Sequence, residues 1–130
     1  MSRLLLVSDC NSLIGLKYQL GADGSSGTID CIHLCYAAFD RLGIIAPPFN
    51  HAWYKASRRD ILRDLYESFV RVHNPRYTNG DLLLIPQNSW AFAVIWSQGV
   101  LYIEPVMERV QWSTTRRFTT LHCFRSKNNL

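Results

Sequence analysis

The chain has no long hydrophobic run. None of its segments approaches the roughly 20 consecutive apolar residues that a membrane-spanning helix needs. The apolar stretch at the N-terminus, 4–7, is shorter than the hydrophobic core of a secretory signal peptide. We therefore expect no membrane span and no signal peptide. Synthesis is expected in the cytoplasm, with any export as part of a larger assembly.

Charged residues are also scarce, at 18% of the 130 residues, whereas hydrophobic residues make up 48%. This balance is typical of a folded globular protein and argues against a disordered one. The length suits a single domain with one core, over residues 1–130. Lys and Arg exceed Asp and Glu by 14 to 10, but they fall in small groups without interleaved aromatics. The charge therefore argues against nucleic-acid binding and is compatible with mild attraction to an anionic polymer or an acidic protein.

Cysteine is sparse and lacks the CxxC spacing of common zinc sites. The four thiols are those of Cys10, Cys31, Cys35 and Cys123. Without a signal peptide we expect them to be free. One zinc set is conceivable: Cys31, Cys35, His33 and His122. Because its spacing matches no common motif, we expect no metal and no cofactor.

The spacing of apolar residues predicts helices in the first half of the chain, near 4–14, 31–42 and 57–71. A loop rich in Gly and Ser, 15–29, separates the first two. The prolines of segment 44–50 predict an extended connection before the third.

Short strands are expected in the second half, over 82–86, 90–96, 100–104, 106–112 and 118–124. Ser97-Gln98-Gly99 predicts a tight hairpin turn between two of them. Helices followed by an antiparallel meander are typical of an α+β fold.

The expected strand 90–96 is apolar on both faces. Alternation places Trp90, Phe92, Val94 and Trp96 on one face and Ala91, Ala93 and Ile95 on the other. This pattern predicts a sheet covered on one side by its own helices and on the other by a further element, such as a partner subunit.

Cys31 is expected at the N-terminus of a helix, directly after Asp30 as N-cap. Unsatisfied backbone N–H groups and the helix dipole favour negative charge there, which stabilises a thiolate. Cys31 is therefore a candidate nucleophile. The alternative is a small buried apolar residue at the start of the helix.

The pattern Gly15-x-x-Tyr18-x-x-Gly21, followed by Gly27-x-x-Asp30-Cys31-x-x-Leu34, resembles the nucleophile segment of the NlpC-type papain-like cell-wall peptidases. Gly80-Asp81-Leu82-Leu83 resembles the segment that opens the first barrel strand of that family. Pro47-Pro48 and Trp53-Tyr54 resemble the subset found in bacteriophage tail-tip proteins. The resemblance implies a papain-like α+β fold, with N-terminal helices packed on a small antiparallel sheet or half-barrel.

By this resemblance Cys31 is the catalytic nucleophile and Tyr18 helps to hold the oxyanion side of the site. The family's histidine opens the second strand. The matching position here is Ala91, or Phe92 after a slip of one residue. Neither side chain can transfer a proton.

Two residues are weak candidates to replace the missing histidine as the base. Glu104 falls at the family's third polar position in the slipped register, and His122 lies in a late strand of the sheet. His33 is two residues after Cys31 on the same helix, so it should point away from the thiol.

Two functions remain open. The first is a structural or assembly component of a phage tail, in the tip, hub or baseplate, built on an NlpC-like domain without its histidine. Its partners would be other tail proteins and its location the virion. The alternative is an active cysteine endopeptidase or amidase that cleaves peptidoglycan when the phage enters its host. An acyltransferase or thioesterase activity is a more distant hypothesis, and it needs the same missing base.

Overall fold

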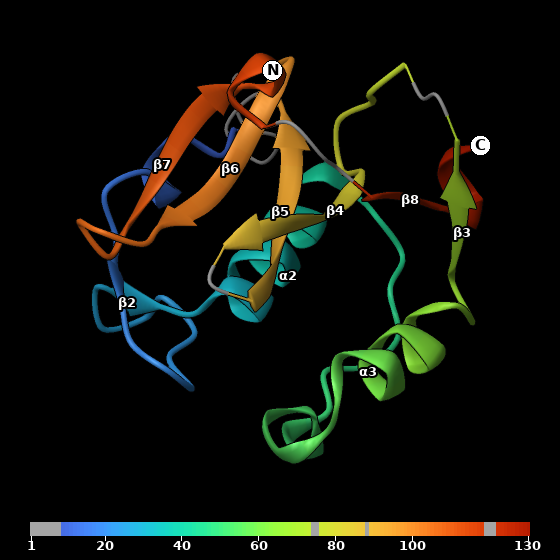
Figure 1. The fold of residues 1–130 in the computed structure, drawn as a ribbon, viewed down its shortest axis with the longest axis horizontal. Coiled ribbons are helices and arrows are strands. Elements are labelled where there is room, and N and C mark those ends of the chain that lie inside the picture. The colour runs from blue at the N-terminus through green and yellow to red at the C-terminus, as the bar shows by residue number, and fades with distance from the viewer. Residues whose placement is uncertain (1–8, 74–75, 88, 119–121) are drawn as a thin grey trace.

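The computed structural model describes residues 9–73, 76–87, 89–118 and 122–130 (Figure 1). Within these ranges the chain forms an α+β layout with one curled eight-stranded sheet, in the order β2-β1-β7-β6-β5-β4-β8-β3. The expected fold class is confirmed at this level. Neither α-helix of the described ranges has the length and apolar character to cross a bilayer.

The α-helices are α2 (Cys31–Leu42) and α3 (Arg58–Leu65). The strands are β1 (Lys17–Tyr18), β2 (Thr28–Ile29), β3 (Phe69–Val72), β4 (Leu82–Gln87), β5 (Ser89–Trp96), β6 (Gly99–Glu104), β7 (Arg109–Thr114) and β8 (His122–Ser126). Short 3-10 helices are η1 (Asn11–Leu13), η2 (His51–Lys55), η3 (Thr115–Arg117) and η4 (Lys127–Asn129).

Helix α2 has the bounds that the sequence predicts, because both of its ends carry local signals. The Asp30 carboxylate accepts the His33 N–H at 2.8 Å as an N-cap. Gly43 follows the last turn with a φ of 70°, the left-handed conformation in which glycine commonly ends a helix. The buried face of α2 packs mainly on β5.

The expected helix 57–71 is wrong in its second half. Helix α3 ends at Leu65, and Phe69 and Val70 belong to β3, which pairs antiparallel with β8. Phe and Val favour strands, and in β3 the Phe69 ring packs against Phe39 of α2, with centroids 5.4 Å apart. Pairing with β8, which lies far along the chain, therefore determines that this segment is a strand.

The N-terminal expectation is tested only in part, because residues 1–8 lie outside the described residues. Of the expected helix 4–14, the described portion contains the single 3-10 turn η1. The region expected as a loop contains two short parallel strands, β1 and β2.

Strands β4 to β7 form the predicted antiparallel meander. Ser97 and Gln98 have φ values of 52° and 63°, the pair of left-handed residues that a type I′ hairpin turn requires. Strand β7 begins at Arg109, three residues later than expected, because Glu104 holds the preceding turn. Strand β8 covers only the end of the expected strand 118–124, of which 119–121 lie outside the described residues.

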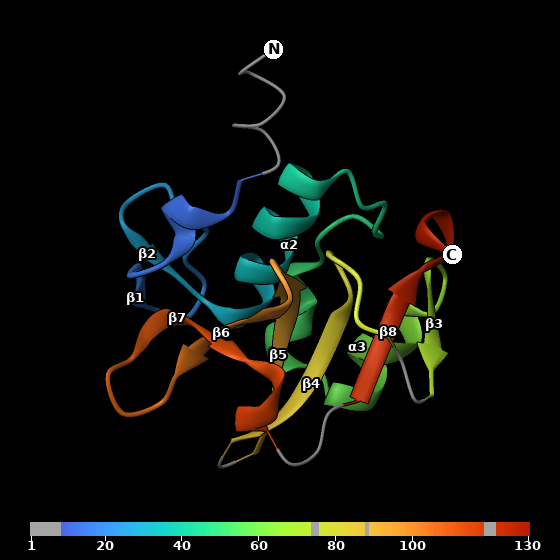
Figure 2. The ribbon, with the colours of Figure 1, turned by 90° about the horizontal axis from the view of Figure 1, so that it is seen from above.

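Both faces of the sheet are buried, as the pattern of strand 90–96 predicts for its described side chains, which exclude Trp90. Phe92 and Val94 pack on the helix side, and Ala93 and Ile95 join a second cluster on the other side. This second cluster is closed by the chain itself, through the curl of the sheet and through Phe118. Figure 2 shows the strands following one another across the molecule, from β7 to β3. The chain itself thus covers these side chains, and the partner subunit that the pattern also allows stays a prediction.

Candidate functional site

Cys31 is the first residue of α2 and faces β5. The residue is half-buried overall, and burial at the sulfur raises the pKa of the thiol above its ordinary value of 9.0. Backbone hydrogen bonds from Phe92, Cys31 and Ile32 lower the pKa, while the neighbouring Asp30 carboxylate raises it further. The helix N-terminus thus acts in the expected direction, but desolvation outweighs it. The thiol is protonated at neutral pH.

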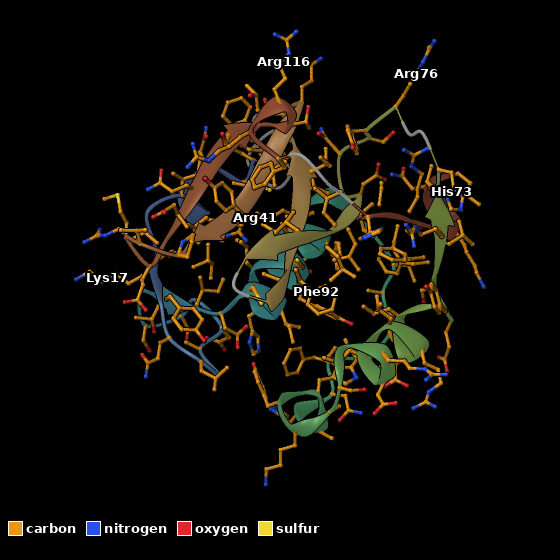
Figure 3. All side chains as sticks on the ribbon, viewed as in Figure 1. Lys17, Arg41, His73, Arg76, Phe92 and Arg116 are labelled. Atoms are coloured by element: carbon orange, nitrogen blue, oxygen red, sulfur yellow. The ribbon has the colours of Figure 1, made fainter. Side chains whose placement is uncertain are left out.

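The backbone of Phe92 lies against this thiol from β5, and the residue is 7% exposed. Its side chain belongs to the helix-side cluster, whereas Ala91 packs against the cluster on the opposite face of the sheet. Of the two residues that the motif match places at the family's histidine position, the structure therefore sets Phe92 beside Cys31. Figure 3 shows Phe92 where β5 crosses α2.

Asp30 joins three segments around the start of α2 and is only 2% exposed. Its Oδ1 accepts the His33 N–H at 2.8 Å and lies 3.1 Å from His33 Nδ1. Its Oδ2 accepts the Gly21 N–H at 2.9 Å and the hydroxyl of Tyr54. The carboxylate therefore ties the glycine-rich loop and η2 to the helix.

His33 is part of the same network. Its Nδ1 lies 3.0 Å from the Tyr54 hydroxyl, and the Phe49 ring stacks on the imidazole with centroids 4.2 Å apart. Because a carboxylate can only accept, the contact with Asp30 assigns the proton to Nδ1. This nitrogen is thus committed to Asp30 and cannot take a proton from the thiol.

Tyr18 lies near enough to Cys31 for the two groups to interact electrostatically. Burial raises the pKa of Tyr18, and the nearby Cys31, Asp30 and Glu108 raise it further. The Tyr18 N–H donates to the Glu108 carbonyl at 2.7 Å, which fixes β1 against the start of β7. The side chain remains 39% exposed.

Tyr54 is a site residue to which the sequence assigned no role. Burial raises the pKa of Tyr54, and the hydrogen bond to Asp30 adds to this effect. The Trp53-Tyr54 pair is noticeable in the sequence, but nothing local indicates that its hydroxyl reaches Asp30, 24 residues earlier.

The two substitute candidates are held elsewhere. His122 pairs with Leu84 on β4, so its strand is two strands from β5, about 10 Å away; its Nδ1 contacts the Arg71 guanidinium. Glu104 accepts the N–H groups of Val106 and Met107, at 3.1 and 2.6 Å, and so caps the β6–β7 turn. These contacts hold the side chains of His122 and Glu104 away from the Cys31 thiol.

The other thiols are also protonated at neutral pH. Burial raises the pKa of Cys10 to about 11 and that of Cys123 to about 12, and it raises the pKa of Cys35 as well. In the described part of the chain, no three His, Cys, Asp or Glu side chains gather as metal ligands.

No protein-family model matches this sequence, and no curated protein matches it. The resemblance to the NlpC-type peptidases therefore depends on the motif residues and stays a prediction.

Proposed function

We propose that this chain is a non-catalytic NlpC-like domain that serves as a structural or assembly component of a phage tail, in the tip, hub or baseplate. The observation that carries the proposal is Phe92, whose backbone reaches the Cys31 thiol from β5 and whose side chain lies on the helix side of the sheet, where the motif match would place the family's histidine. Papain-like catalysis needs a thiolate and an adjacent proton carrier. Here burial raises the pKa of the thiol, and the β5 residue that reaches it is Phe92, whose side chain cannot transfer a proton.

The polar groups around Cys31 support the same conclusion. Asp30, His33 and Tyr54 bond to one another and to the loop at Gly21. The bonds from Asp30 to Gly21 and Tyr54 hold separate segments of the chain together, and the contacts with His33 cap the helix. The network therefore stabilises the fold at the point where the family performs its chemistry, and the partners of the domain would be other tail proteins in the virion.

An active endopeptidase or amidase acting on peptidoglycan is the second candidate. One observation favours it: the backbone N–H groups of Phe92, Cys31 and Ile32 lower the pKa of the Cys31 thiol, as a thiolate would require. This function needs a base from outside the described contacts, such as a histidine of a neighbouring subunit.

The two candidates differ in hydrolysis. Purified protein is incubated with cell-wall peptidoglycan, and newly released amino groups and reducing ends are measured. We expect no release above the level of Cys31→Ala. Release by the native protein that disappears in Cys31→Ala would establish the enzyme instead. Cys35→Ala is the matched control, because Cys35 lies one turn further along α2 and is buried in the core.

A further inference from the structure

Residues 46–65, which contain η2 and α3, lie in the connection between α2 and β3. In the described part of the chain, every backbone–backbone hydrogen bond of this segment ends within 46–68. Pro47 and Pro48 lack the N–H group that pairing with a strand requires. Figure 1 shows α3 outside the sheet, below α2 and β4. We call residues 46–65 the flap.

Both ends of the flap are fixed at the same place, the C-terminal segment 126–128. Before the flap, the Ile45 N–H donates to Asn128 Oδ1 at 3.3 Å, and the Ile45 carbonyl accepts the Ser126 hydroxyl at 3.2 Å. After the flap, the Lys127 N–H donates to the Ser68 carbonyl at 2.8 Å. Residues at the ends of a segment can absorb the backbone rotation of a hinge motion. Ile45 and Ser68 are therefore placed as hinges.

A hydrogen bond joins the two halves of the flap. Trp53 Nε1 in η2 donates to Asp64 Oδ2 in α3 at 2.8 Å. The Phe49 ring packs edge-on against the Trp53 ring, with centroids 5.5 Å apart. These contacts lie within the flap, so they persist if the flap moves as one unit.

Side chains attach the flap to the rest of the molecule. Among the described residues, two tyrosines supply the hydrogen bonds across this boundary. The Tyr54 hydroxyl donates to Asp30, and the Tyr36 hydroxyl of α2 donates to the Pro47 carbonyl at 2.6 Å. A segment that shares no backbone bonds with its surroundings opens at a lower free energy than the strands of a sheet.

The packing beneath the flap is incomplete. Trp53, Ile61 and Leu65 are buried in the helix-side cluster. An apolar cavity of about 10 Å³ lies between these three side chains, Cys35 of α2 and Phe92 of β5. Atoms that line an unfilled space lose dispersion contacts, which weakens this interface. Cys35 is only 2% exposed and lies on the floor that the flap covers.

We propose that the flap swings away from α2 and β5 as one unit about the hinges at Ile45 and Ser68. Opening uncovers Cys35 and separates Tyr54 from Asp30. The position of the flap thus controls whether the polar network beside Cys31 is complete. This device goes beyond the proposed function, because it operates whether or not Cys31 is catalytic.

The test measures how strongly each buried thiol is protected from N-ethylmaleimide. The native chain is labelled at several urea concentrations below its unfolding transition, and mass spectrometry resolves the sites. Each rate is compared with that of the same cysteine in the unfolded chain. We expect Cys35 to be about tenfold less protected than Cys123, which lies in the cluster on the other side of the sheet.

Amide hydrogen exchange at Ala38 is the control for local unfolding of α2. Ala38 lies one turn after Cys35 in the same helix. Because the flap leaves α2 folded when it opens, we expect the Ala38 amide to be more strongly protected than the Cys35 thiol.

Two substitutions distinguish flap opening from global unfolding. Tyr36→Phe removes a bond that opening breaks, so it should lower the protection of Cys35 about fivefold, the equivalent of one hydrogen bond. Asp81→Asn removes the ion pair with Arg125, which lies outside the flap. It should lower the free energy of unfolding in urea and leave the protection of Cys35 unchanged.

Three results would overturn the proposal. Equal protection of Cys35 and Cys123, with the same dependence on urea, would mean that both thiols are exposed only by global unfolding. Equal protection of Cys35 and the Ala38 amide would assign the exposure to unfolding of α2. A loss of Cys35 protection in Asp81→Asn that matches the loss of global stability would exclude a separate flap. None of these results alters the peptidoglycan assay, so the flap and the loss of catalysis are tested separately.

Discussion

Two buried aspartates, each beside a cysteine, organise opposite parts of this molecule. Asp30 lies next to Cys31 at the start of α2, and Asp81 lies next to Cys123 at the start of β4. Asp30 binds backbone N–H groups, a phenol and an imidazole. Asp81 instead holds the Arg125 guanidinium by two bonds of 2.8 Å and the Thr78 N–H at 2.9 Å.

The comparison shows that the motif cysteine has the environment of a structural one. In both clusters burial raises the pKa of the thiol, and the adjacent carboxylate raises it further. A nucleophilic cysteine requires the opposite, a cationic neighbour that lowers the pKa. Asp30 and Cys31 therefore resemble Asp81 and Cys123 in chemistry, although only the first pair lies in the segment that resembles a catalytic motif.

The largest expected effect is at the ionic cluster. Asp81→Asn removes the charge that pairs with Arg125, whose side chain is 17% exposed. Breaking a buried pair leaves one charge uncompensated, so we expect a loss of about 3 kcal/mol in the free energy of unfolding. Urea denaturation measures it, with Asp40→Asn on the exposed side of α2 as the control. A loss as small as that of the control would show that Arg125 is stable without its partner.

Asp30→Asn should cost less, about 1–2 kcal/mol. Asparagine remains a good N-cap for α2, and the partners of Asp30 carry no fixed charge. The same urea measurement applies. A loss equal to that of Asp81→Asn would break the comparison, because it would require an ionic function for Asp30.

Tyr54→Phe removes a single hydroxyl from the Asp30 network. We expect a loss of about 1 kcal/mol, together with faster exchange of the His33 amide. Tyr66→Phe is the matched control, because Tyr66 is exposed and packs on Phe124 by its ring. Equal losses for both variants would remove Tyr54 from the network.

The last expected effect is confined to alkaline pH and is a change in the slope of stability with pH. The pKa of Cys123 is about 12 in the folded chain, against an ordinary value of 9.0. Between these values the folded chain keeps a proton that the unfolded chain has lost, so stability falls as pH rises. Cys123→Ala should make the free energy of unfolding fall less steeply over this range. An unchanged slope would mean that the thiol ionises normally in the folded chain.

The sequence predicts those parts of the fold that have local signals. Asp30 and Gly43 mark the ends of α2, and Ser97 and Gln98 form the predicted turn. The sequence-based prediction fails for β3. Phe69 continues the helical spacing of α3, whereas its pairing partner, Ser126, lies far along the chain. Local periodicity carries no information about that pairing.

The candidate site likewise contains some residues that the sequence predicts and others that it does not. Cys31 and Tyr18 come from short motifs, and the structure places them together. The choice between Ala91 and Phe92 depends on which face of β5 meets α2, which the sequence alone leaves open. Tyr54 reaches Asp30 only through the path of the connection between α2 and α3.

The most direct measurement is the alkylation rate of Cys31 by iodoacetamide as a function of pH, followed by mass spectrometry, in the native chain and in Phe92→His. In the native chain the rate should keep rising with pH beyond the ordinary thiol value of 9.0, because burial raises the pKa of Cys31. Phe92→His places an imidazole in the cluster against which Cys31 packs, and a cation there should shift the rise to lower pH. A native rate that is already constant near neutral pH would establish a thiolate and contradict the account of a domain without catalysis.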